Sequence, residues 1–229
     1  MSARSWDGTR AMVLGAVGGY VDTVGYVMLH GLFPNHVTGN LPIAAAHPGW
    51  QAGPLVLMVP LWLVAVIGAA RVARRVEPAS LSVLLAMEAV LLLAFLLLGV
   101  VLVPGRHAPT FVTQALVGTA GVCAMGVQSV VTRLGGYTYP TTMITGTLTL
   151  LGMDIADSSS PAVRRRIAAF SRVVLAFAVG AALGGVVTAG LRFWAIALPL
   201  AGVVYCAGRE GRAMTVTADG RAPSRDGHA

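Results

Sequence analysis

The sequence contains no lysine, and only 11% of its 229 residues are charged. A chain with so few charges and 56% hydrophobic residues is neither disordered nor an ordinary soluble domain. The net charge of +7 comes entirely from arginine. Because the arginines lie at the ends of apolar runs, their positions indicate membrane topology rather than binding to nucleic acid.

Cysteine is also scarce, and the common catalytic motifs are missing. The two cysteines, Cys123 and Cys206, lie in apolar segments, so we expect free buried thiols and no disulfide. The sequence has no Ser/His/Asp arrangement with supporting context, no His-Glu-x-x-His motif and no phosphate-binding loop. We therefore predict a protein that is not an enzyme and that carries no cofactor and no metal.

Long apolar runs dominate the chain, and we count six membrane crossings. Backbone polar groups must be satisfied within a membrane, so each crossing is predicted to be an α-helix. One arrangement places nearly all arginine clusters, and with them both termini, on the cytoplasmic side. The predicted spans are Ala11–Leu29, Leu55–Ala73, Leu81–Val103, Thr110–Val131, Ile167–Ala189 and Phe193–Ala207.

The same short pattern occurs twice, about 106 residues apart. The first copy runs over Gly15–Val24 and continues to Thr38–Gly39–Asn40. The second copy runs over Gly121–Val130 and continues to Thr145–Gly146–Thr147. A repeat of membrane-spanning segments, broken by glycine and proline at matching places, is typical of transporters or channels built from two similar halves.

The repeat predicts that the two halves are inverted. The first half, about residues 11–103, has three crossings, and three is an odd number. The second half, about residues 110–207, therefore enters the membrane from the opposite side. We expect residues 1–208 to form a single membrane domain and residues 209–229 to form a disordered cytoplasmic tail.

Each half contains one segment that is too short and too interrupted to be a crossing. Glycine and proline break both segments, because proline lacks an amide donor and glycine weakens a helix interior. Irregular backbone at membrane depth is tolerated only where protein buries it or where it lines a watery cavity. We expect re-entrant half-helices over Gly31–Ala46 and Gly136–Gly152. Surface loops followed by interfacial helices are the alternative.

Asp22 lies near the middle of the first apolar span. An ionised carboxylate at that depth is costly, so such residues face a partner or a cavity. Asp22 is either a proton- or cation-coupling group or a structural carboxylate that hydrogen-bonds hydroxyls such as those of Thr38 or Thr145. Its counterpart Gln128 forms similar hydrogen bonds but does not ionise, and this asymmetry favours a single titratable site.

The other candidates for binding a solute or an ion surround the two Thr-Gly pairs. His36 precedes the first pair, and histidine titrates near neutral pH. Glycine and threonine allow a ligand to approach closely, or alternatively allow helices to pack closely. The full candidate set is Asp22, His36, Thr38, Gly39, Asn40, Gln128, Thr145, Gly146 and Thr147.

Two further features concern packing. Gly15/Gly19 and Gly180/Gly184 are spaced four residues apart, as at close helix contacts in membranes. Such a contact lies either between the two halves or between the subunits of a homo-oligomer. Glu88 lies about a third of the way into the third span, where it either reaches the cytoplasmic interface or pairs with an arginine.

The paired motifs resemble those of a known family. They are Gly19–Asp22 and Val37–Leu41 in the first half, and Ala124–Gln128 and Ile144–Leu148 in the second. They resemble the signature of the YoaK-type family of uncharacterised bacterial membrane proteins. The resemblance covers nearly the whole chain except the tail. It implies a six-helix, multi-pass protein of the bacterial inner membrane and brings no established activity.

The leading hypothesis is a secondary transporter of a small polar or anionic solute, proton-coupled through Asp22. Its site would lie at the midplane between the inverted repeats. A passive channel for small solutes is one alternative, and a non-transporting assembly or sensor protein is another. The expected partners are the lipid bilayer, a small solute and protons, with no nucleic acid.

Overall fold

The computed structural model describes residues 3–49, 52–77, 79–104, 109–134, 144–157 and 160–219. Nearly all of these residues are helical, and no strand occurs among them. Six of the described helices have 23 residues or more, and two shorter helices lie between them. The elements are α1 (Ala3–Met28), η1 (Val37–Gly39), α2 (Asn40–Ala46), α3 (Ala52–Arg75), α4 (Ser80–Leu102), α5 (Phe111–Leu134), α6 (Ile144–Ala156), α7 (Pro161–Leu191), η2 (Arg192–Ile196) and α8 (Ala197–Asp219).

Five helical stretches in the described part of the chain are long and apolar enough to cross a membrane. This number differs from the six predicted crossings because α7 and α8 follow one another through η2 and form one continuous stretch of 52 residues. The helices thus have the length and composition of a multi-pass membrane protein. The stretches are Gly8–Met28, Ala52–Arg75, Ser80–Leu102, Phe111–Leu134 and Pro161–Arg212.

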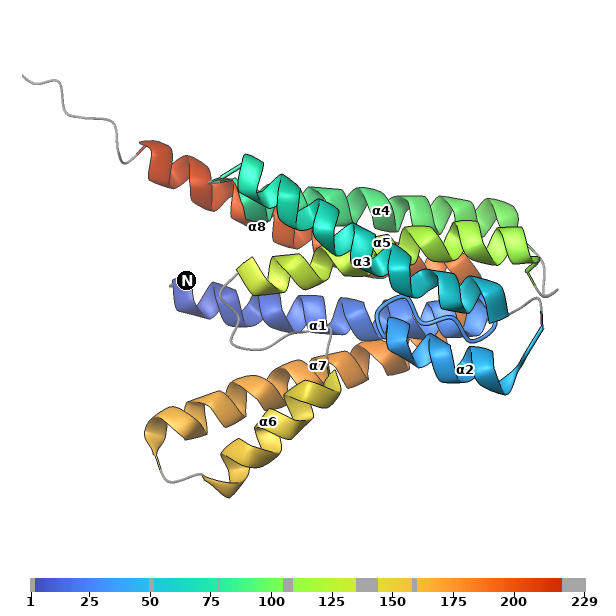
Figure 1. Ribbon diagram of the computed structural model, residues 1–229. Helices are drawn as coiled ribbons and strands as arrows, with labels where there is room; N and C mark the ends of the chain where they lie inside the picture. The colour runs from blue at the N-terminus through green and yellow to red at the C-terminus, as the bar shows by residue number, and fades with distance from the viewer. Residues whose placement is uncertain are drawn as a thin grey trace, which may run out of the picture.

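The long helices pack into a bundle that mixes the two halves of the sequence (Figure 1). Helix α1 packs most extensively along α7, and α3 packs along α5. Helix α4 contacts both α5 and α8. Each of these contacts joins a helix of the first half to a helix of the second.

The crossing of α1 and α7 depends on small residues. A Cβ atom added at Gly19 would collide with the carbonyl oxygen of Phe177, and one added at Gly180 would collide with that of Ala16. A Cβ at Gly184 would lie 2.9 Å from the carbonyl oxygen of Tyr20. The predicted glycine pairs therefore form a close contact between the two halves of one chain.

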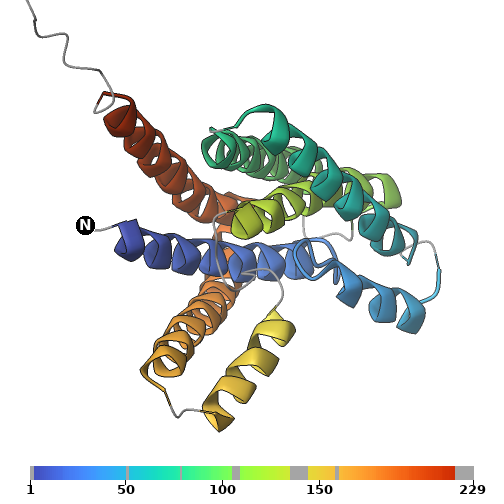
Figure 2. The same ribbon diagram turned by 60° about the vertical axis from the view of Figure 1, so that its left-hand side comes forward.

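Helix α6 and the first turns of α7 form a hairpin whose outer end projects from the bundle (Figures 1 and 2). Ser160 caps α7, because its Oγ accepts a hydrogen bond of 3.2 Å from the backbone nitrogen of Val163. Asp154 of α6 forms an ion pair with Arg166 of α7, and their Oδ2–Nε hydrogen bond is 2.9 Å. The pair fixes the short helix to the long one.

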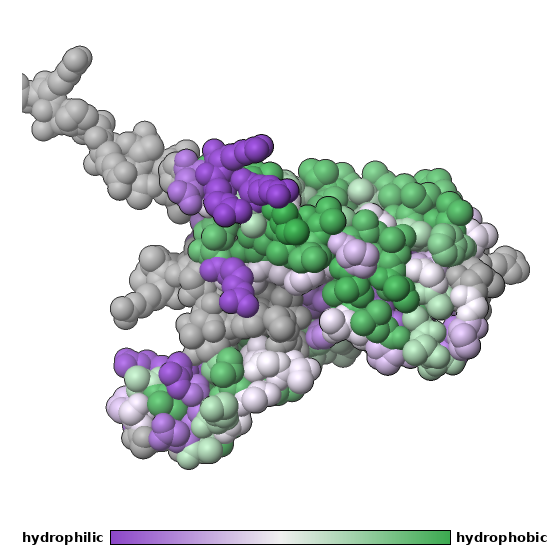
Figure 3. Space-filling model, in the orientation of Figure 1, coloured by the Kyte–Doolittle hydropathy of each residue, from purple (hydrophilic) through white to green (hydrophobic). Residues whose placement is uncertain are grey.

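Polar and charged residues gather at the end of the bundle where α1 begins and α8 ends (Figures 1 and 3). The last turns of α3 and α5 and the first turns of α7 supply arginines to this end, and apolar side chains cover most of the helix surface elsewhere in that view. The arginines on these segments and on α8 are Arg71, Arg74, Arg75, Arg133, Arg164, Arg165, Arg166, Arg209 and Arg212.

Helix α8 is longer than the sequence predicts. It continues through Asp219, whereas composition predicts a disordered tail over residues 209–229. Glu210 of α8 forms an ion pair with Arg10 of α1, which is 2% exposed, and this pair joins the start of the expected tail to the bundle. Residues 220–229 lie outside the described residues.

The predicted re-entrant segments are described in part. Over residues 31–46 the chain is irregular up to His36 and then forms η1 and α2. In the second half, residues 135–143 lie outside the described residues, and α6 follows them. The two short helices therefore occupy matching places in the two halves.

Candidate functional site

The chain reverses direction after α1 and returns along that helix. His30 and Gly31 have φ angles of 51° and 88°, which end the helix in a turn. Gln114 of α5 stabilises the turn, since its Nε2 donates a hydrogen bond of 2.7 Å to the carbonyl oxygen of Leu29. A Cβ at Gly25 would lie 2.5 Å from Cδ of Pro34, so only glycine lets the returning segment, residues 31–36, approach so closely.

Asp22 anchors this returning segment to α1. Its Oδ1 accepts hydrogen bonds from the backbone nitrogens of Asn35, at 2.6 Å, and His36, at 3.3 Å. Its Oδ2 pairs with Nδ1 of His36. The Asp22 side chain is 6% exposed, and the His36 side chain is 32% exposed. The buried carboxylate thus contacts three nitrogen atoms, while the predicted hydroxyl partners, on Thr38 and Thr145, are not among its hydrogen-bond partners.

Asn40 fixes the same segment from the other side. Its Oδ1 accepts a hydrogen bond of 2.7 Å from the Phe33 backbone nitrogen, and its Nδ2 donates one of 3.0 Å to the Phe33 carbonyl oxygen. The side chain is fully buried. Asn40 therefore shapes the backbone before α2 and does not line the cavity described next.

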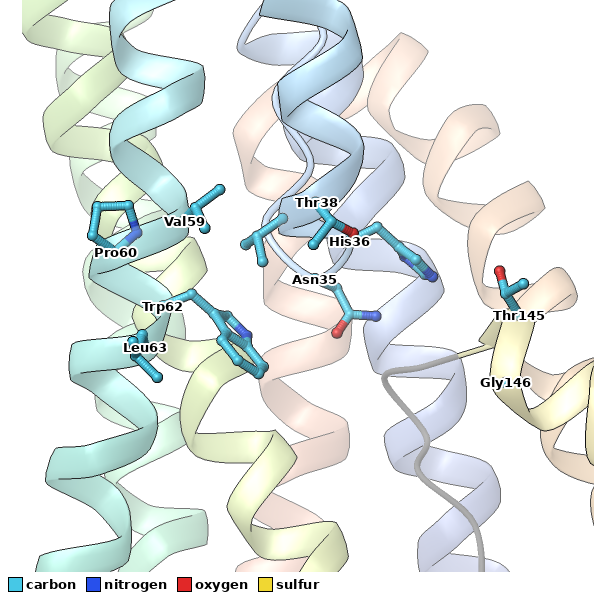
Figure 4. Close-up of a pocket in the computed structure, with 10 residues that line it drawn as sticks. Asn35, His36, Thr38, Val59, Pro60, Trp62, Leu63, Thr145 and Gly146 are labelled. Atoms are coloured by element: carbon cyan, nitrogen blue, oxygen red, sulfur yellow. The ribbon is translucent and has the colours of Figure 1, made fainter.

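A cavity of about 620 Å³ lies between the returning segment, α3 and the start of α6 (Figure 4). Figure 4 shows α3 side chains on one side and Thr145 with Gly146 on the other, with Asn35, His36 and Thr38 between them. Residues from the two sequence copies thus line one cavity. The described residues of the lining are Asn35, His36, Val37, Thr38, Val59, Pro60, Trp62, Leu63, Thr145 and Gly146.

The structure divides eight of the nine predicted site residues into two groups of four, and the ninth, Asp22, belongs to neither group. Four line the cavity, and Asp22 lies directly behind its wall, joined to it through His36. The other four residues are outside the lining; among them Gln128 is fully buried and donates a hydrogen bond of 2.8 Å from Nε2 to the carbonyl oxygen of Leu14. The first group is His36, Thr38, Thr145 and Gly146, and the second is Gly39, Asn40, Gln128 and Thr147.

Gly18 of α1 leaves space for two buried amide side chains. A Cβ at Gly18 would lie 3.0 Å from Nδ2 of Asn35 and 3.7 Å from Nε2 of Gln128. The counterpart of Asp22 in the second copy is therefore close to the cavity wall although it does not line the cavity. The polar layer behind the wall includes both members of the asymmetric pair, Asp22 and Gln128.

Two lining residues that carry polar side-chain atoms, Asn35 and Trp62, were not among the predicted site residues. Asn35 is 4% exposed, and in the described part of the chain neither polar atom of its side chain has a hydrogen-bond partner. The indole nitrogen of Trp62 is also buried and has no partner among the same residues. Asn35 could have been found as an additional polar residue inside the first break, whereas a tryptophan in an apolar span gives no comparable signal.

The described residues form a helical bundle that has several helices long enough to span a bilayer and a cavity between the returning segment, α3 and α6. This fold is that of a multi-pass helical membrane protein. The model of a family described as a protein of unknown function (DUF1275) matches residues 10–208, and the chain belongs to this family. Comparison with curated proteins and with solved structures gives no match.

Proposed function

We propose that the protein is a secondary transporter of a small polar solute, coupled to protons through Asp22. One observation carries the proposal: residues of both sequence copies line a single cavity, and the buried Asp22 pairs with a residue of its wall. Intramembrane carboxylates that pair with a residue beside a cavity are typical of proton relays in transporters. The described part of the cavity wall is mostly apolar and carries a few polar groups, which is typical of sites that bind small molecules.

The inverted 3+3 architecture is part of this proposal, and the helix contacts support it. If α1 corresponds to α5 and α3 to α7, the packing of α1 on α7 corresponds to the packing of α3 on α5. The short helices α2 and α6 then correspond as well, as two re-entrant half-helices. A helix of 52 residues would be about 78 Å long, so the last apolar stretch crosses a hydrocarbon core of about 30 Å twice.

We further propose that the arginine-rich end of the bundle faces the cytoplasm, with both termini on that side. Positively charged residues concentrate in the cytoplasmic segments of membrane proteins. The motif resemblance to the YoaK-type family agrees with this arrangement and adds the bacterial inner membrane as the location.

The bonds of Asp22 suggest how protonation would act on the cavity. The carboxylate attracts two backbone N–H groups and the His36 ring, and such charge-assisted hydrogen bonds are stronger than neutral ones. Protonation removes the negative charge and weakens the attachment of the returning segment to α1. Because that segment forms a cavity wall, solute binding and proton binding then affect one another by the same free energy.

Side-specific labelling tests the coupling without knowledge of the solute. Thr38→Cys and Thr145→Cys, each in a chain lacking Cys123 and Cys206, would be labelled in sealed vesicles with and without a pH gradient. We expect the accessible side to change with the gradient, and we expect Asp22→Asn to abolish this change. The amide of the variant still offers a carbonyl oxygen to the backbone N–H groups, so the fold should persist.

His47→Cys is the control, because this exposed residue follows α2 and lies outside the cavity lining. Its labelling rate measures the direct effect of pH on thiol reactivity. Dividing the labelling rates at the cavity positions by this rate removes that effect. Access that ignores pH, or that switches equally in Asp22→Asn, contradicts coupling through Asp22. Simultaneous access from both sides identifies the passive channel instead. Protection of both cavity positions from either side in folded protein rejects transport altogether.

A further inference from the structure

The charges around the cavity restrict which solutes it can accept. Among the described residues of its lining, only His36 ionises, and its Nδ1 already pairs with Asp22. No arginine is among these residues. A buried anion requires a charged or strongly hydrogen-bonding partner. The wall therefore favours an uncharged solute over a carboxylate or a phosphate.

The polar groups of the wall that lack partners among the described residues indicate which hydrogen-bonding groups the solute carries. The Asn35 side chain presents a donor and an acceptor, and Trp62 presents an indole donor. These atoms are buried, and each lacks a hydrogen-bond partner among the residues that the structure describes. Buried polar groups are normally satisfied, so a solute with a carbonyl oxygen and an N–H group complements them after small side-chain rotations.

The apolar part of the lining extends to the outer face of α3. Pro60 and Leu63 line the cavity and are both exposed, Leu63 at 53%. Exposed apolar residues on a membrane-spanning helix face lipid. Proline inside α3 also removes one backbone hydrogen bond at this point. The cavity is therefore open toward the region that the bilayer covers, which suits a solute that partitions into lipid.

We infer that the solute is an uncharged amphipathic molecule, with an apolar body and a carboxamide-like group that hydrogen-bonds Asn35 and Trp62. This inference rests on the proposed function, because the ligand is a transported solute only if the protein is a transporter. Binding itself is measured separately from coupling. Benzamide, benzoate and benzamidine provide matched probes, since they have nearly the same shape and are neutral, anionic and cationic, respectively.

The test uses the full chain carrying Thr145→Cys and lacking the two native cysteines. A neutral thiol reagent labels this position in the presence of increasing concentrations of each probe. We expect benzamide to slow the labelling at least about threefold and the two charged probes to leave it nearly unchanged. Loss of one hydrogen bond in Trp62→Phe should raise the half-protecting benzamide concentration about fivefold. Asn35→Leu should raise it at least as much.

Trp194→Phe is the matched control, because Trp194 is 57% exposed on η2 and lies outside the lining. It should leave the half-protecting concentration unchanged. Stronger protection by benzoate, equal effects of both tryptophan variants, or no protection by any probe would overturn the inference. If the pH-dependent change in access at Thr38→Cys persists in that case, the transport proposal stands and only the solute class is wrong.

Discussion

Two side chains determine the course of the chain between α1 and α2. Asp22 accepts hydrogen bonds from the backbone nitrogens of residues 35 and 36. Asn40 forms hydrogen bonds with the backbone nitrogen and the carbonyl oxygen of Phe33. Only Asp22 is connected to a titratable residue of the cavity wall. The two residues share a motif, but from these contacts we propose a structural role for Asn40 and a coupling role for Asp22.

Replacement of Asn40 by leucine should destabilise the protein. The substitution keeps a similar volume and leaves the N–H and carbonyl groups of Phe33 without their partners, at a cost of about 1–3 kcal/mol in the free energy of unfolding. Thermal or detergent-induced unfolding of the purified protein measures this. The exposed Thr38→Val should change the free energy of unfolding by less than about 0.5 kcal/mol. Equal effects of the two substitutions would contradict the structural role of Asn40.

The sequence identified the polar residues of this region better than it identified their partners. Asp22 stands out because an acidic residue in an apolar span is unusual, but its main partners are backbone N–H groups of a turn, which no residue pattern reveals. Asn35 and Trp62 remained unnoticed as lining residues for a related reason. Their importance comes from where the returning segment brings them, beside α3 and α6.

Among the elements, α1 and α7 approach one another so closely that glycine is required where their backbones meet. Gly180→Ala would place a methyl group against the backbone of Ala16, and backbone yields less readily than a side chain. We expect a loss of at least about 2 kcal/mol in the free energy of unfolding, even though alanine favours helix formation by about 1 kcal/mol over glycine. Unfolding in a denaturing detergent measures the loss.

Gly190→Ala supplies the comparison on the same helix. An added Cβ there meets no atom within 4 Å, so the substitution should be neutral or stabilising by up to about 1 kcal/mol. If Gly180→Ala and Gly190→Ala change the free energy of unfolding equally, α1 and α7 do not approach one another as closely as described.

Helix positions were predictable where apolar runs define them, and less so where polar residues extend a helix. The third predicted span, Leu81–Val103, differs from α4 by one residue at each end. The fifth, Ile167–Ala189, falls short of α7, which begins at Pro161. Arginine is a good helix former, so the helix includes Arg164 to Arg166, which a hydropathy pattern assigns to a loop.

At the scale of the whole molecule, the proposed orientation predicts which ends are accessible from each side. Helix α2 ends at the end of the bundle opposite the arginine-rich end, whereas α3 ends at the arginine-rich end (Figure 1). His47 directly follows α2, and Arg75 is the last residue of α3. In intact cells, an impermeant thiol reagent should label His47→Cys at least about tenfold faster than Arg75→Cys. After permeabilisation the two rates should become similar. The reverse preference would place the arginine-rich end outside.

The arrangement of the two halves was only partly predictable. The repeat indicates that α2 and α6 have matching places, and the cavity does bring Thr38 near Thr145 and Gly146. The glycine pairs left a choice between a contact within one chain and a contact between subunits. The same small-residue spacing is compatible with a contact within one chain and with a contact between subunits. The packing of α7 along α1 shows that the glycines form a contact within one chain.

The packing of α1 on α7 also has a consequence for biosynthesis. The ribosome completes α1 long before it reaches α7, so the glycine-rich face of α1 is inserted before its intramolecular partner exists. The same delay applies to α3, which must await α5, although for a shorter time. The nascent protein therefore requires lipid, the insertion machinery or another membrane protein to shield these faces. Chains truncated before residue 161 should be substrates for quality-control proteases rather than stable half-proteins.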